Sequence, residues 1–133
     1  MKDVGSRIVK SIPLGSRIEV CDNSGAKIIK VFSVRGHKTV KSRFPAAGVS
    51  DFINASVIKG KPGMRKQVVQ AIIVRQKKEY RRPDGTRIKF SDNAAVILKD
   101  DKGNPKGTMF KGPIAKEVVT RWPAIGKIAK VVV

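Results

Sequence analysis

The chain has 133 residues, of which 41% are hydrophobic, and its 29 Lys and Arg against 10 Asp and Glu give a formal net charge of +19. This apolar content is too high for a disordered tail, so we expect one folded domain over residues 1–133. Such a charge surplus destabilises a compact chain by self-repulsion, and it predicts a polyanionic partner: nucleic acid first, an anionic membrane surface second.

Cysteine usage and the N-terminal residues bear on the compartment. Cys21 is the only cysteine, so no internal disulfide can form, which suits a reducing interior. The first ten residues carry charges at Lys2, Asp3, Arg7 and Lys10 and no apolar run of the signal-peptide type. Apolar runs elsewhere are too short to span a membrane. We therefore expect a soluble intracellular protein.

Short β-type runs follow one another through the first hundred residues. They are separated by Gly, Pro, Asn and Asp, a spacing typical of a small closed β-barrel. Closure would also remove the exposed edges of strands rich in Ile and Val. We expect a mainly β fold with a five-stranded barrel over about residues 15–100 and with Val57, Ile73 and Ile97 in its core. The predicted strands cover residues 17–21, 26–35, 51–59, 68–76 and 94–99.

The pattern changes near the C-terminus to that of a helix. Pro113 suits a first helical turn, and Ile114, Val118 and Trp122 follow at the four-residue spacing of one apolar stripe. Pro123 ends this helix, because its ring clashes with the preceding turn. We expect a C-terminal segment at about 108–130 with one or two short helices.

A projecting basic β-ribbon is predicted at about residues 76–90. Pro83 fixes φ at the first central position of its turn, Asp84 tolerates the second, and Gly85 takes a positive φ. Beyond the apolar run that ends at residue 74, the sequence stops alternating. Both faces of the ribbon are therefore expected to be exposed, and its order to come from something that it touches.

Basic residues on this ribbon and elsewhere are the candidates for nucleic-acid contacts. Arg binds phosphate bidentately and stacks on bases, whereas Lys acts as a point charge. Tyr80 is expected either to stack on an unpaired base or to pack on the Lys and Arg stems. The RNA-binding candidates are Lys27, Arg35, Lys38, Arg43, Lys59, Lys61, Arg65, Lys66, Arg75, Lys77, Lys78, Arg81, Arg82, Arg87 and Lys89.

Catalytic and metal-binding patterns are absent from the sequence. His37 is the only histidine, so no zinc cluster can be assembled, and we expect a polar loop residue or an RNA contact there. Cys21 is expected to be a small core residue rather than a nucleophile. Glycine-rich nucleotide-binding motifs do not occur. We therefore expect no enzyme, no metal and no cofactor.

One long spaced motif carries a family resemblance. It consists of Ala-Ile-Ile-Val at 71–74, Asp84-Gly85, Phe90, Asn93 and Val96-Ile97. This motif resembles the signature of the universal family of large-subunit ribosomal protein fourteen. Shorter matches at 20–26, 48–51 and 107–113 extend the resemblance to about residues 15–130.

Two further stretches indicate the branch of that family. The sequences at 59–66 and 121–123 resemble the archaeal and eukaryotic branch, and the compact length favours the archaeal one. Met109 departs from the Arg that bacterial members usually carry, so the bacterial contact at this position is not carried over.

The resemblance implies a barrel with a ribbon and short C-terminal helices, and a structural place in the large ribosomal subunit in the cytoplasm. It implies binding to large-subunit rRNA and to small-subunit rRNA at an intersubunit bridge. Universal ribosomal protein three and the anti-association initiation factor six are the implied protein partners. Thr108 matches the subunit-facing position of the family, and we expect that surface at Thr108, Lys111, Lys116, Thr120 and Lys127.

Two other classes of function stay open on charge alone. A small basic barrel that binds duplex DNA as a chromatin-type protein would have the same composition. An RNA-processing enzyme would need a catalytic constellation that the sequence lacks. If the partner is RNA, its A-form duplex hides the major-groove edges, so we expect contacts to phosphates and 2′-hydroxyls rather than sequence recognition.

Overall fold

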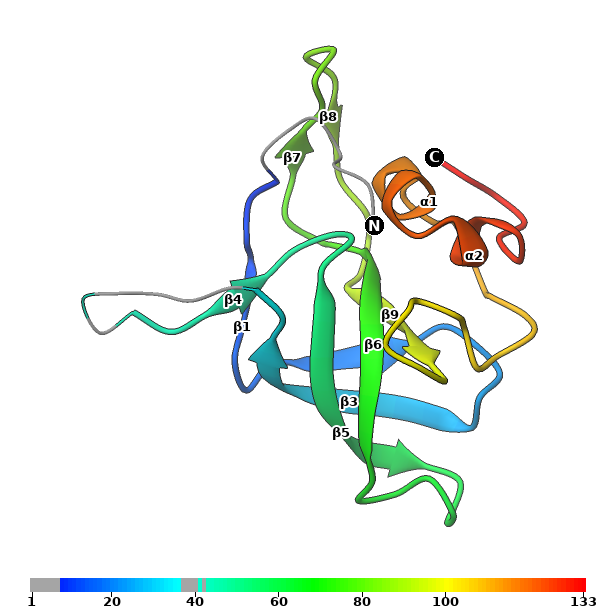
Figure 1. The fold of residues 1–133 in the computed structure, drawn as a ribbon. Helices are drawn as coiled ribbons and strands as arrows, with labels where there is room; N and C mark the ends of the chain where they lie inside the picture. The colour runs from blue at the N-terminus through cyan, green and yellow to red at the C-terminus, as the bar shows by residue number, and fades with distance from the viewer. Residues whose placement is uncertain (1–7, 37–40, 42) are drawn as a thin grey trace.

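Five strands close into a barrel at the centre of the computed structural model, which describes residues 8–36, 41 and 43–133 (Figure 1). The order around the barrel is β2–β3–β5–β6–β9. These strands are β2 (Arg17–Val20), β3 (Ala26–Val34), β5 (Phe52–Gly60), β6 (Val68–Arg75) and β9 (Ala94–Leu98). Each coincides with a predicted run, so the predicted fold class is confirmed.

A parallel strand pair completes the barrel. β2 and β9 run parallel, with Glu19 opposite Ala94, whereas every other neighbouring pair in the barrel is antiparallel. The pair joins the first and the last barrel strand of the chain. Both strands would otherwise be open edges, so closure satisfies their backbone groups within the protein.

Small and β-branched side chains fill the barrel. Ile53, Ala55 and Val57 alternate along β5 and point inward, and each is at most 2% exposed. Ile73 of β6 and Ile97 of β9 belong to the same hydrophobic cluster and are fully buried. The predicted barrel core is therefore confirmed.

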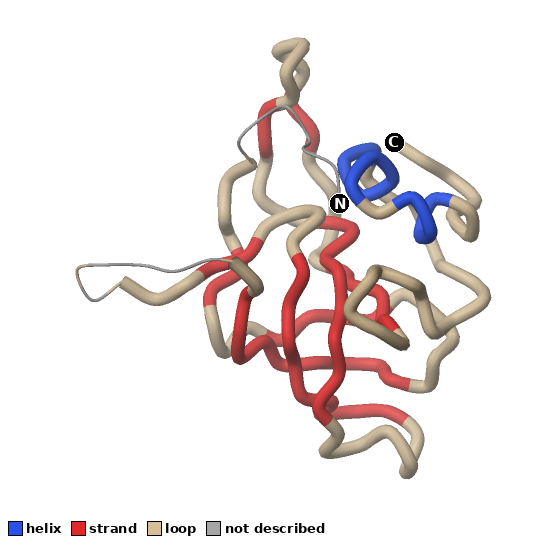
Figure 2. Tube along the Cα trace, in the orientation of Figure 1, coloured by secondary structure: helices blue, strands red, loops and turns tan. Residues whose placement is uncertain are grey.

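Within the described residues the chain forms two short helices, α1 (Lys116–Arg121) and α2 (Pro123–Gly126), which lie on one side of the barrel (Figure 2). The predicted helix began two residues too early. Ala115 is extended, with φ −65° and ψ 141°, and Ile114 pairs with Val132 in a parallel bridge. Pro123 starts a helix instead of only ending one. Neither helix is long and apolar enough to cross a membrane.

Trp122 joins the C-terminal segment to the barrel. Its ring centroid lies 5.9 Å from that of Phe52, and its indole N–H donates a 2.9 Å hydrogen bond to the Ser50 carbonyl. Gly103, at φ +95°, packs against the ring face, where a Cβ would lie 2.5 Å from Cε3. The junction therefore requires both the indole and a residue without a side chain opposite it.

Two short strand pairs lie outside the barrel order. β7 (Tyr80–Arg81) pairs with β8 (Arg87–Ile88), and β1 (Ile12–Pro13) pairs with β4 (Ala46–Ala47), a pair that the sequence did not predict. The ribbon ladder is thus much shorter than the predicted 76–90. The predicted turn is confirmed, because Gly85 has φ +89° and donates its N–H to the carbonyl of residue 82.

Replacing Ile73 with Ala should lower the free energy of unfolding by about 2–5 kcal/mol, because it removes buried methyl groups and leaves a cavity. Val68 lies on the same strand but is 69% exposed. Val68→Ala is therefore the matched control, with an expected change within about 0.5 kcal/mol. Denaturant unfolding followed by Trp122 fluorescence measures both. A loss below about 1 kcal/mol for Ile73→Ala would contradict the inward orientation of Ile73.

Candidate nucleic-acid interface

Nearly all basic side chains of the described residues are exposed, whereas several acidic ones are bonded inside the protein. Only three described cations are not exposed, and each of them meets a carboxylate. These pairs are Arg75–Asp92, Arg82–Glu117 and Arg121–Asp51. A further buried carboxylate, that of Asp22, accepts the backbone N–H of Ile97 at 2.9 Å. The solvent-facing surface is therefore more strongly positive than the composition suggests.

One group of exposed cations, here called the loop cluster, lies where β5 turns into β6. Its backbone is fixed by Met64, which is buried against the barrel, and by the Lys61 N–H, which donates to the Gly25 carbonyl at 3.0 Å. Gly60 permits this approach, because a Cβ there would lie 2.7 Å from the same carbonyl oxygen. The members of the loop cluster are Lys27, Lys59, Lys61, Arg65 and Lys66.

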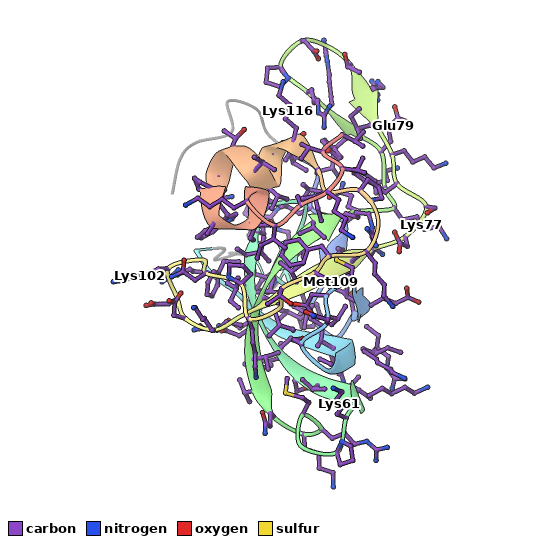
Figure 3. All side chains as sticks on the ribbon, turned by 90° about the vertical axis from the view of Figure 1, so that its right-hand side faces the viewer. Lys61, Lys77, Glu79, Lys102, Met109 and Lys116 are labelled. Atoms are coloured by element: carbon purple, nitrogen blue, oxygen red, sulfur yellow. The ribbon has the colours of Figure 1, made fainter. Side chains whose placement is uncertain are left out.

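A second group, the ribbon cluster, lies on and beside β7 and β8. Among the described residues its one acidic contact is the exposed pair of Arg87 with Glu79, at 3.3 Å, and a pair of this kind adds little stability. The members are Lys77, Lys78, Arg81, Arg87 and Lys89, all exposed. In Figure 3, Lys61 of the loop cluster and Glu79 of the ribbon lie at opposite ends of the molecule.

The inner face of the ribbon docks on α1 through one carboxylate. Glu117, 6% exposed, accepts a hydrogen bond from the Tyr80 hydroxyl at 3.1 Å and one from Arg82 Nε at 2.7 Å. Arg82 also donates to the carbonyl of Val133. Burial, with the Glu117 charge beside the hydroxyl, raises the pKa of Tyr80 well above its ordinary value. We call Tyr80, Arg82 and Glu117 the ribbon clamp.

This clamp corrects two predictions about the ribbon. Its two faces are not both exposed, because Tyr80 is 1% exposed and Phe90 is 7% exposed. Base stacking by Tyr80 is therefore wrong, since no face of its ring is free. The order of the ribbon comes from the chain's own helix α1, toward which Tyr80 of β7 and Arg82 just after it both point.

Arg75 has a similar internal role. Its Nε donates to Asp92 at 3.0 Å, and its Nη1 donates to the carbonyls of Lys111 at 2.8 Å and Pro113 at 3.0 Å. At Gly112 a Cβ would lie 2.6 Å from that Nη1, so the backbone approaches closely. Of the predicted RNA contacts, Arg75 and Arg82 are thus the two whose guanidinium groups donate to intramolecular acceptors inside the protein.

The remaining RNA-binding candidates lie between β3 and β4. Arg35 is exposed, but its guanidinium lies 4.5 Å from the centroid of the Phe52 ring and donates to the Asp101 carbonyl at 3.1 Å. Arg43 is exposed. Lys38 and His37 lie outside the described residues.

The predicted subunit-facing residues are all exposed, and two regions of the chain hold them. The Asn23 side chain accepts the N–H of Thr108 at 2.8 Å and donates to its hydroxyl at 2.9 Å. Lys116 and Thr120 lie one turn apart on α1, where the Thr120 hydroxyl donates to the Lys116 carbonyl at 3.2 Å. The full set is Thr108, Lys111, Lys116, Thr120 and Lys127.

A hollow of about 250 Å³ separates the ribbon turn from α1. Pro83 and Asp84 line it from the turn, and Lys116, Glu117 and Thr120 line it from the helix. Figure 3 shows Lys116 beside the ribbon. The ribbon and the predicted subunit-facing surface therefore adjoin each other.

The chemistry of the described residues offers no catalytic centre. Cys21 is 5% exposed, and burial raises the pKa of its thiol to about 11, so the nucleophilic thiolate is disfavoured at neutral pH. This agrees with the predicted core role of Cys21. Among residues 8–36, 41 and 43–133, no group of three His, Cys, Asp or Glu side chains is arranged to hold a metal ion.

Sequence reasoning missed the buried acids that organise these basic surfaces. Asp51 accepts from Lys10 at 2.7 Å and from Arg121 at 3.4 Å, and its partners lie far away along the chain. Glu117 could have been found, because it lies three residues after Ile114 and one before Val118. Helical spacing places it at the edge of the predicted apolar stripe.

Comparison with known proteins identifies a family. The family described as Ribosomal protein L14p/L23e matches residues 11–133. A protein named large ribosomal subunit protein uL14 from Nanoarchaeum equitans is 53% identical over 133 residues, which is 100% of both chains. Proteins of the same name from Methanococcus maripaludis and Methanococcus vannielii are 52% identical over 132 residues, or 99% of each chain.

Replacing Glu117 with Ala should lower the free energy of unfolding by about 3–5 kcal/mol, because Arg82 loses its carboxylate inside the protein. Tyr80→Phe removes only the hydroxyl and should cost about 1 kcal/mol. Glu79→Ala breaks the exposed pair with Arg87 and serves as the matched control, at less than about 1 kcal/mol. Chemical unfolding measures all three. If Glu117→Ala proved as mild as Glu79→Ala, the docking of the ribbon on α1 would be refuted.

Proposed function

The chain belongs to the family of ribosomal protein L14p/L23e, and on that premise we propose that it is a non-enzymatic structural constituent of the large ribosomal subunit that binds rRNA through phosphate and shape contacts. The observation that carries this proposal is the separation of charge: buried or half-buried cations are paired with carboxylates, and the others are exposed. A polyanion that binds such a surface releases its condensed counterions into the solution, which favours binding. A chromatin-type protein would carry a similar positive charge, but the family to which this chain belongs is ribosomal.

The proposed rRNA contacts exclude the two internally bonded arginines. The loop cluster and the ribbon cluster lie at opposite ends of the molecule, which supports contacts with more than one RNA segment (Figure 3). Exposed Lys and Arg side chains at these sites suit phosphate oxygens. The contacts proposed are Lys27, Arg35, Lys38, Arg43, Lys59, Lys61, Arg65, Lys66, Lys77, Lys78, Arg81, Arg87 and Lys89.

The whole chain is proposed to act as one domain. The apolar cluster between the barrel and the C-terminal segment supports this, because it includes Phe52 of β5 together with Val118 of α1 and Ile125 of α2. A shared core makes the parts fold as a unit. The ribbon and the C-terminal surface then have fixed positions relative to the barrel.

The C-terminal surface is proposed to face the small subunit. Its exposed residues are Thr108, Lys111, Lys116, Thr120 and Lys127. Small-subunit rRNA at an intersubunit bridge and the anti-association initiation factor six would compete for it, so that occupancy by the factor blocks subunit joining. Universal ribosomal protein three is proposed as a neighbour within the large subunit.

Replacing Lys78, Arg81 and Lys89 with Gln should weaken binding to large-subunit rRNA and should reduce the slope of log K against log salt by about 2–3, since each lost phosphate contact contributes about 0.7–0.9. The matched control is Gln at Lys99, Lys102 and Lys130, which are exposed cations outside the proposed set. The control removes the same formal charge and should change the slope by less than about 1.

Titration with labelled rRNA over a range of KCl concentrations gives both slopes. Equal changes in the two triple variants would show that the ribbon cluster is not a specific contact. Duplex DNA of matched length is the comparison ligand. Tighter binding to that DNA than to rRNA at the same salt concentration would contradict the ribosomal proposal and favour the chromatin alternative.

Charge reversal at Lys111, Lys116 and Lys127 should leave incorporation into large subunits intact. It should weaken subunit joining or factor binding on the order of tenfold, because the acidic replacements would repel the partner that these lysines attract. Sedimentation of reconstituted subunits separates the two effects. The same positions changed to Gln provide a milder control that keeps Glu117 undisturbed. Failed incorporation with normal joining of the particles that do assemble would assign this surface to large-subunit rRNA instead.

A further inference from the structure

The outer side of β3, β5 and β6 is a barrel wall that the C-terminal helices leave open. In Figure 1 both helices lie toward the ribbon, away from the front of β5 and β6. Asn54 and Ser56 alternate with the core residues of β5 and therefore point outward. Asn54 lies opposite Gln70, and Ser56 lies opposite Lys30 of β3 and Val68 of β6. Residues directly opposite share a face, and we call this face the outer wall.

Two like charges lie side by side on the outer wall. Arg17 of β2 is directly opposite Lys30 of β3, and both are exposed. Neither side chain forms an ion pair or a hydrogen bond with a described residue. Glu19 is the only acid in β2, β3, β5 and β6, and within the described part of the chain it pairs with neither cation. Like charges in opposite positions of a sheet are destabilising, so this pair points to an anion from outside the fold.

The neutral polar side chains of the outer wall are also unused by the fold. Asn54, Ser56 and Gln70 are half-buried, and their side chains form no hydrogen bond with any described residue. Amide and hydroxyl groups both donate and accept hydrogen bonds. Apolar surface lies beside them, because Val68 is 69% exposed and Phe32 of β3 is 48% exposed. The outer wall thus combines two free cations with polar groups that bond in both directions.

A duplex of A-form RNA supplies the complement to each of these features. Its minor groove is wide and shallow, so the convex side of a barrel can enter it. The groove displays 2′-hydroxyls, which donate and accept hydrogen bonds, and phosphates follow both of its rims. A basic protein segment would repel Arg17 and Lys30, and an apolar one would bury both without a counter-charge. The charge of the outer wall therefore favours RNA.

We propose that the outer wall docks in the minor groove of an rRNA duplex, where Asn54, Ser56 and Gln70 bond to 2′-hydroxyls. Arg17 and Lys30 contact phosphates on one rim of the groove. This inference rests on the proposed rRNA binding. It adds a site that is separate from the loop cluster and the ribbon cluster, and this site recognises the riboses and the shape of a duplex rather than its sequence.

Hydroxyl radicals released at the outer wall locate the RNA that lies against it. Val68→Cys introduces a thiol at an exposed position, whereas the native Cys21 is 5% exposed and is shielded from labelling. The full chain, with an iron–EDTA chelate on this thiol, is bound to large-subunit rRNA, and the cleaved riboses are mapped. We expect cuts in both strands of a duplex, displaced on each strand toward its 3′ end, as a source in the minor groove produces. Lys102→Cys, on an exposed loop, is the matched control and should not give this pattern.

Three cleavage results would overturn this inference while leaving rRNA binding intact. Cuts confined to unpaired nucleotides would show a single strand on the outer wall. An absence of cuts from position 68 would show that RNA does not reach it. Cleavage of another protein's backbone from position 68 in assembled subunits would show that a protein, with its own acids for Arg17 and Lys30, covers the outer wall instead.

Two duplexes of one sequence test the role of the 2′-hydroxyls. A duplex with 2′-fluoro riboses keeps the A form and the phosphates of the RNA duplex but lacks the hydroxyl donors. We expect the wild-type chain to bind the RNA duplex about 5- to 50-fold more tightly, the effect of two or three hydrogen bonds. Ser56→Ala with Gln70→Ala should lower this preference by about fivefold. Thr86→Ala with Ser91→Ala removes two exposed hydroxyls elsewhere and is the matched control, which should keep the preference.

Equal affinity of the wild-type chain for the two duplexes would refute the minor-groove contact. A preference that survives Ser56→Ala with Gln70→Ala would refute it as well. In both cases binding to large-subunit rRNA would persist, and the proposed function would stand. If the wild-type chain binds neither this rRNA nor the RNA duplex, the proposed function fails together with this inference.

Discussion

Three guanidinium–carboxylate contacts between distant parts of the chain hold the projecting segments on the barrel. Arg121 of α1 reaches Asp51 beside β5, Arg82 of the ribbon reaches Glu117 of α1, and the segment before α1 is fixed by Arg75, which pairs with Asp92. Buried ion pairs are costly to form, but removing one partner is costlier still, so each contact fixes a particular arrangement. The chain has only 10 acidic residues against 29 Lys and Arg. The carboxylates that form these three pairs therefore do not neutralise the exposed lysines and arginines.

Much of the fold was predictable because the barrel depends on local patterns. Short runs rich in β-branched residues and separated by turn residues located all five barrel strands, and Pro83, Asp84 and Gly85 specified the ribbon turn. The start of α1 was not predictable. Ile114 fits the helical spacing, yet it forms a bridge with Val132, and propensities of neighbouring residues do not encode such a tertiary contact. β1 and β4 have two residues each and therefore carry no periodicity at all.

The basic interface was predictable in composition but not in detail. Arg82 and Arg87 lie on the same ribbon and look alike in the sequence, yet one is bonded to buried Glu117 and the other to exposed Glu79. Their difference follows from which side of the ribbon faces α1, and that depends on tertiary packing.

The ribbon clamp also links the entropy costs of binding at two surfaces. Glu117 holds β7 and α1 together through Tyr80 and Arg82, so the ribbon and the helix lose conformational freedom as one body. A partner that immobilises the ribbon therefore also reduces the freedom left to α1. Whatever binds the helix afterwards would have less ordering to impose, so two such partners would favour each other's binding without touching and without any change of shape.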